Sequence, residues 1–153
     1  LQGPRQLDDV RRALADHLYG ARVTHFSTAE IEAWGRAERV FLAEARETLQ
    51  GAAAGGLRRD LTAGGIDADA LIAAGAGWVP PDDATFRATV LAGAGVGEGW
   101  ARWGLPDRIA GLLVIPSRNN AFALVDPMTW RLVSGKLDQD SGVYKTIRAR
   151  INS

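Results

Sequence analysis

The chain contains no cysteine, and this absence excludes disulfide frameworks, thiol nucleophiles and cysteine metal sites together. Acidic and basic residues are equal at 18 each, so the overall charge favours neither nucleic acid nor membrane as a partner. No apolar run reaches the roughly 18 residues of a membrane-spanning helix, and the N-terminus lacks the basic-then-apolar layout of a signal peptide. We therefore expect a soluble chain without a membrane partner, whose compartment the sequence does not assign.

A length of 153 residues with 46% apolar content is enough for one domain with its own core. The first four residues, Leu1-Gln2-Gly3-Pro4, resemble what a viral 3C-type protease site leaves in expression vectors, although a natural start is an alternative. We predict that residues 1–4 are such a remnant, and that residues 5–153 form a single domain excised from a longer protein. Its helical part is expected over 5–103 and its sheet part over 105–153.

Four helices are predicted in the first part. Apolar residues recur at three and four positions over 7–19, the spacing of one helical face. The second helix has the strongest signals, since Ser27 and Glu30 form a capping box at its start and Gly51 ends it. A short third helix follows Asp67 as N-cap over 67–74. The fourth begins after Asp82 or Asp83, and its predicted apolar face is Phe86, Val90 and Leu91.

Beyond residue 103 the apolar period changes from 3.6 to 2, which favours strands. Strands are predicted over 109–115, 121–125, 130–134 and 143–151, with a type I turn at Asp126-Pro127-Met128-Thr129 between the second and third. The expected fold is α+β, with N-terminal helices packed on a C-terminal antiparallel sheet of about four strands. The helices are expected to cover one face of this sheet.

The last predicted strand carries the main functional hypothesis. With a period of two, its apolar set is Val143, Ile147, Ala149 and Ile151, with Lys145 as the single misfit, and its polar set is Tyr144, Thr146, Arg148 and Arg150. From Arg118 onward six basic residues stand against three acidic ones, and Arg118 and Lys136 fall in loops at the ends of the sheet. The pattern predicts one core face and one face that binds phosphate, although an ordinary solvent-facing edge gives the same pattern.

Other motifs are less specific. The alternating glycines at 93, 95, 97 and 99 match no phosphate-binding loop, and Asp138 and Asp140 lack the remaining positions of a calcium loop. No metal and no cofactor are expected. His17 is interpreted as a helix-surface or packed residue, whereas His25, just before the capping box, is a candidate for proton transfer. Four tryptophans (Trp78, Trp100, Trp103 and Trp130) are expected to close the core or to form a binding surface.

These residues lead to two hypotheses. The first is a metal-independent ribonuclease of the C-terminal toxin-module type, in which His25 is base or acid, Tyr144 or Thr146 positions the substrate, and cations bind it (Arg118, Lys136, Arg148 and Arg150). Helices followed by an antiparallel sheet also occur in several toxin nucleases, but no family motif matches residue by residue. The neutral net charge counts against RNA as the partner.

The second hypothesis is a non-enzymatic interaction or assembly module. Such a module, in a phage or secretion apparatus or as an adaptor, would dock a protein partner through a sheet edge or a tryptophan-rich surface. The partner would be an inhibitor or an assembly neighbour. This hypothesis accounts for the balanced charge and for the lack of a sharp catalytic motif.

Overall fold

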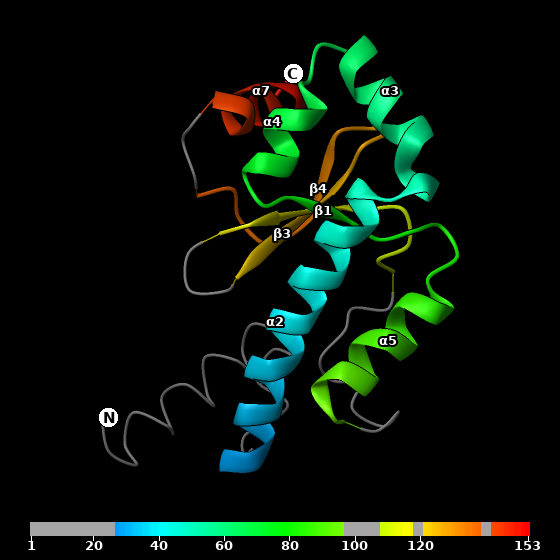
Figure 1. Ribbon diagram of the computed structural model, residues 1–153. Coiled ribbons are helices and arrows are strands. Elements are labelled where there is room, and N and C mark those ends of the chain that lie inside the picture. Colours follow the sequence, from blue (N-terminus) through cyan, green and yellow to red (C-terminus); the bar gives the residue numbers. More distant parts are fainter. Residues whose placement is uncertain (1–26, 97–107, 118–120, 139–141) are drawn as a thin grey trace.

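A computed structural model describes residues 27–96, 108–117, 121–138 and 142–153 (Figure 1). The helix predicted over 7–19 lies outside these residues. The described helices are α2 (Thr28–Gln50), the 3-10 helix η2 (Ala52–Ala54), α3 (Gly55–Ala63), α4 (Ala68–Ala73), α5 (Ala84–Ala94) and α7 (Gly142–Ile151). The strands are β1 (Gly77–Trp78), β2 (Leu113–Pro116), β3 (Phe122–Asp126) and β4 (Arg131–Ser134).

The four strands form one antiparallel sheet in the order β1-β2-β3-β4, which confirms the predicted α+β class. One strand prediction was nevertheless wrong, and one strand was missed. Residues 143–151 are helical, and the fourth strand of the sheet is instead β1, a two-residue segment between α4 and α5. Because β1 is so short, its sequence shows no alternation of apolar and polar residues that could have predicted a strand.

Helices cover both faces of the sheet rather than the single face expected (Figure 1). Alternate residues of β2 and β3 enter two separate cores, because successive side chains of a strand point to opposite faces. Leu113 and Val125 pack with residues of α3, α4 and α7, whereas Val114 and Leu124 pack with residues of α2 and α5. The long α2 serves both cores, contributing Leu49 to the first and Phe41 to the second.

The ends of the helices lie close to where the sequence predicts them. Helix α2 begins directly after Ser27 and ends at the residue before Gly51. The carboxylate of Asp67 accepts a hydrogen bond from the backbone N–H of Ala70 at 3.1 Å, which confirms it as the N-cap of α4. Asp83 precedes α5 as expected, but its carboxylate binds Arg87 at 2.8 Å instead of a backbone N–H of the helix.

The backbone of β1 lies unusually close to α2. A Cβ atom added to Gly77 would lie 2.6 Å from the Cβ of Ala45 and 2.7 Å from the backbone nitrogen of Arg46. Real Cβ atoms essentially never approach so closely, so only glycine fits at this position. Gly77 therefore allows α2 to pack directly on the β1 end of the sheet, and α5 lies alongside α2 through an edge-to-face contact of Phe41 with Phe86.

Candidate functional site

Residues 143–151 form a helix whose buried side follows the helical period. Tyr144 and Ile147 are buried, Val143 and Ile151 are half-buried against the same core, and Lys145 and Thr146 are exposed. The prediction of one apolar and one polar strand face was therefore wrong. Lys145, the misfit of the alternating pattern, lies on the exposed side of the helix.

Tyr144, predicted to position a substrate, is 1% exposed and serves the fold. Its hydroxyl donates a hydrogen bond of 2.7 Å to the backbone carbonyl of Ala74, the residue that caps the C-terminus of α4. Burial raises the pKa of the hydroxyl above its ordinary value of 10.0. The group is therefore a hydrogen-bond donor at physiological pH and is not available to a ligand from the surface.

Arg148 and Arg150, predicted to bind phosphate, also contact backbone carbonyls. The guanidinium of Arg148 donates to the carbonyl of Leu137 at 2.6 Å. That of Arg150 donates to the carbonyl of Gly64, which caps the C-terminus of α3. Both side chains are half-buried. These contacts hold α7 against the β4–α7 connection and against the end of α3.

The same kind of contact occurs at the ends of α2 and α5. Arg58 donates to the carbonyls of Leu49 and Gly51 at 2.7 and 2.6 Å, and Arg36 donates to the carbonyl of Ala94 at 3.1 Å. None of α2, α3, α4 and α5 has a basic residue in its own last turn. A helix C-terminus carries unpaired carbonyls and a partial negative charge. Donors from other elements supply what these four helices lack locally.

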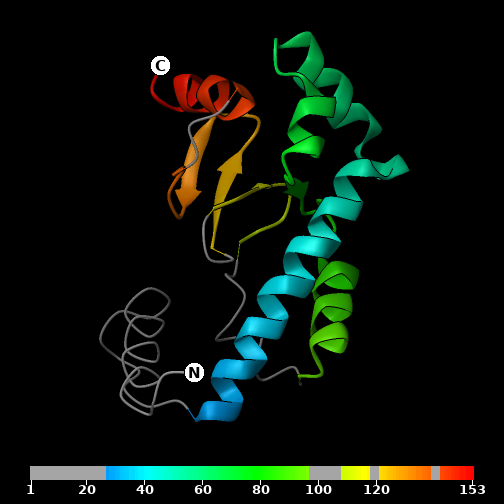
Figure 2. The ribbon, with the colours of Figure 1, turned by 60° about the vertical axis from the view of Figure 1, so that its left-hand side comes forward.

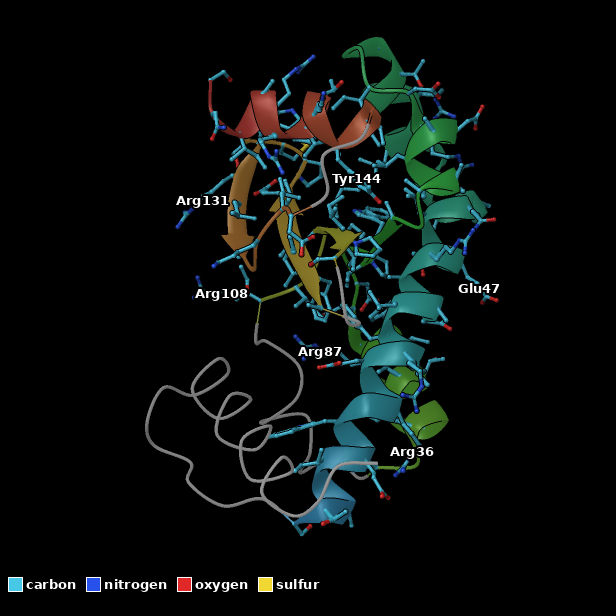
Figure 3. The ribbon with its side chains drawn as sticks, turned by 90° about the vertical axis from the view of Figure 1, so that its left-hand side faces the viewer. Arg36, Glu47, Arg87, Arg108, Arg131 and Tyr144 are labelled. Atoms are coloured by element: carbon cyan, nitrogen blue, oxygen red, sulfur yellow. The ribbon has the colours of Figure 1, made fainter. Side chains whose placement is uncertain are left out.

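The structure does not gather the predicted site residues on one face. Tyr144 lies beneath α7 in the interior (Figure 3). Thr146 on the same helix is exposed. Lys136 is exposed after β4, and Arg148 and Arg150 are directed to separate carbonyls. His25 and Arg118 lie outside the described residues, so the approach of His25 to the other candidates stays a prediction.

Of the tryptophans, Trp34 and Trp78 are buried and Trp130 is half-buried against the core of the α7 face. The indole N–H of Trp78 donates to the carbonyl of Gly111 at 3.0 Å. These side chains close the core, which is the first of the two roles predicted for the tryptophans. Trp100 and Trp103 are outside the described residues.

The surface that stands out is the hairpin of β3 and β4. In Figure 2, β4 lies at the border of the sheet away from α2, and within the described residues its backbone pairs only with β3. Leu132 faces the core, whereas Arg131, Val133 and Ser134 are exposed. Figure 3 shows Arg131 extending outward from β4.

This hairpin also carries exposed apolar side chains. Met128 in its turn is 85% exposed and Val133 in β4 is 46% exposed, and these are the exposed large hydrophobic residues of the described part. The sequence predicted Met128 only as a turn residue and assigned no role to Val133. An exposed valine on a strand and an exposed methionine in a turn have no pattern of their own, and only their position on an open edge marks them.

Several other kinds of site find no support in the described part of the chain. No group of three or more histidine, aspartate or glutamate side chains is placed to hold a metal ion there. None of the helices described combines the length and apolar character needed to cross a membrane.

Among the described residues, Glu38 has a strongly shifted pKa. Burial raises the pKa of its carboxyl from 4.5 to about 7, and the neighbouring charge of Arg39 partly offsets this rise.

Comparisons with known proteins give no relative: no family model, no curated protein and no solved structure matches this chain.

Proposed function

We propose that this domain binds a partner protein by adding an extended segment of that partner to the open edge of β4. The observation that carries the proposal is the coincidence of two features on one hairpin. The β4 edge is not paired by any other described element, and Met128 and Val133, the exposed large apolar residues of the described part, lie on the same hairpin.

Strand addition uses groups that an edge strand already presents. Unpaired backbone N–H and C=O groups supply affinity, and the alternate side chains of the edge supply selectivity. In this hairpin Val133 and Met128 offer apolar contact area to the added segment. Leu132 keeps β4 anchored in the core while the edge is used.

The same edge carries features that discourage pairing with a second copy. β4 has only four residues, the β3–β4 register is interrupted by an irregularity between Leu124 and Val125, and Arg131 places a positive charge at the edge. Natural proteins use short strands, bulges and charges against self-association. These features leave a partner of a different sequence as the favoured occupant.

A displayed library of short extended peptides tests the proposal. A selected peptide should shift the backbone amide NMR signals of residues 131–134 more than those of the helices. Methylating the alternate backbone nitrogens of that peptide that face β4 should abolish binding, because a methylated nitrogen cannot donate to a strand, whereas methylating the other alternate set should be tolerated. Shifts centred elsewhere, or binding that tolerates methylation on both alternate sets of nitrogens, would overturn the proposal.

The ribonuclease hypothesis is a second and weaker candidate. It is supported by the cationic C-terminal part, where the described residues from 121 onward include five arginines and lysines and two aspartates. Against it, Tyr144 and Arg148 are engaged with backbone carbonyls. Cleavage of single-stranded RNA in EDTA that is lost in both His25→Ala and Lys136→Gln would establish it. A folded domain that leaves RNA intact at high concentration would remove it.

A further inference from the structure

We propose that the segment bound at β4 is acidic, and that Arg131 and Lys136 select it. This inference rests on the proposed function and adds the chemistry of the partner. Arg131 is the first residue of β4, Lys136 follows its last residue by two positions, and both are exposed. The two cations therefore stand at opposite ends of the proposed docking edge.

Neither cation is neutralised by a carboxylate in the part of the chain that the structure describes. Arg131 lies opposite Asp126 in the β3–β4 register, yet the two form no ion pair. The Asp126 carboxylate instead accepts a hydrogen bond of 2.8 Å from the backbone N–H of Met128. Lys136 likewise has no ion pair with a described residue. Two exposed cations that no described carboxylate pairs, beside a strand edge, attract a segment of opposite charge.

The size of the edge fixes the size of the segment. Four residues of β4 extend over roughly 13 Å, because a strand rises about 3.3 Å per residue. A segment of about five residues would cover this edge and place side chains beside both Arg131 and Lys136. Residues alternating between acidic and apolar would offer carboxylates to the two cations and apolar contact to the exposed Val133.

Charge also argues against two other occupants. A second copy of β4 would bring its own Arg131 and Lys136 to a cationic edge, where like charges repel. A single strand of RNA has the right charge, but it cannot pair with the backbone of a sheet edge, and the described tryptophans that could stack on bases are buried or half-buried.

Three capped five-residue peptides serve as probes, in which valine alternates with glutamate, with glutamine or with lysine. Binding is followed by the amide NMR shifts of residues 131–134. At low salt the glutamate peptide should bind about tenfold more tightly than the glutamine peptide, because only its carboxylates can pair with the two cations. The lysine peptide should bind most weakly, and added salt should reduce the differences in affinity among the three peptides.

The double variant Arg131→Gln/Lys136→Gln should lose this preference while keeping its affinity for the glutamine peptide. A matched control is Arg46→Gln/Arg59→Gln, which removes the same charge from exposed positions on α2 and α3 and should keep the preference. Equal binding of the three peptides at β4 would overturn the acidic inference and leave the proposed function standing. No shift at β4 with any peptide would overturn both. An RNA oligonucleotide that shifts the same amides at lower concentration would also overturn the inference.

Discussion

The hydroxyl of Tyr144 donates a hydrogen bond to the carbonyl of Ala74, 70 residues earlier in the chain, at 2.7 Å. This contact joins the C-terminal helix to the end of α4, beneath the core that both share. It belongs to a set in which side chains from one element cap the C-terminus of another. Arg150 does this for α3, Arg58 for α2 and Arg36 for α5. The cations near the C-terminus are thus partly structural, which removes most of the argument for a phosphate-binding row.

Replacing Tyr144 with Phe should lower the free energy of unfolding by about 1–3 kcal/mol, because the partly buried carbonyl of Ala74 loses its hydrogen-bond donor. Thr146→Val, on the exposed side of the same helix, should stay within about 0.5 kcal/mol of the wild type. Urea unfolding curves measure both. An equal effect of the two changes would mean that the Tyr144 hydrogen bond does not hold α7 in place.

Comparing Arg58 with its neighbour Arg59 distinguishes the effect of capping a helix from the effect of removing a positive charge. Arg58→Leu should destabilise the domain by about 1–2 kcal/mol, since it removes the donor shared by the carbonyls of Leu49 and Gly51. Arg59→Leu removes the same charge from an exposed side chain one position later and should change the free energy of unfolding little. Thermal melts of the two variants decide between the roles, and a larger loss for Arg59→Leu would contradict the capping account.

The close approach of β1 to α2 predicts opposite outcomes for two glycines. Gly77→Ala should destabilise by about 1–3 kcal/mol or more, because the new methyl group would overlap Ala45. Gly56→Ala, at the second residue of α3, meets only the end of the Arg59 side chain at 3.9 Å and should stabilise by about 0.5 kcal/mol. Urea midpoints of the two variants test this. A neutral Gly77→Ala would mean that α2 does not pack directly on β1.

Glu38 should make stability depend on pH. Its pKa rises from 4.5 to about 7 on folding, so the folded protein binds the proton more tightly than the unfolded chain. The stabilising contribution of this group is complete below pH 4.5 and is lost as the pH rises through 7. Glu38→Gln should therefore be more stable than the wild type at pH 8, with a flatter pH profile between 4.5 and 7. Glu47→Gln, exposed on the same helix, should keep the wild-type slope.

Local signals in the sequence located much of the fold. The bounds of α2 follow from Ser27 and Gly51, and the start of α4 follows from Asp67, because caps and breakers act on their immediate neighbours. The buried side of α5 was predicted from the spacing of Phe86, Val90 and Leu91 alone. The antiparallel sheet followed from short apolar runs separated by turn residues.

The rest depends on contacts between distant residues. The segment at 143–151 satisfies both a period of two and a helical period, and its burial against α4 decides for the helix. Arg150 was assigned to a ligand because nothing near it in the sequence indicates Gly64, 86 residues away, as its partner. The sequence predicted a sheet edge as a docking surface but did not assign that edge to β4, because a sequence does not show which strand lies at the border of a sheet.

The most direct test of the proposed docking edge uses the absence of cysteine. Ser134→Cys at the exposed end of β4 and Thr146→Cys on the exposed side of α7 each give a single site for a photoreactive label. With a peptide selected on the wild-type domain, irradiation should produce a covalent adduct at position 134 and little at position 146. The same peptide methylated on the backbone nitrogens that face β4 should form little adduct at position 134. Equal labelling at both positions, or an adduct mainly at 146, would contradict strand addition at β4.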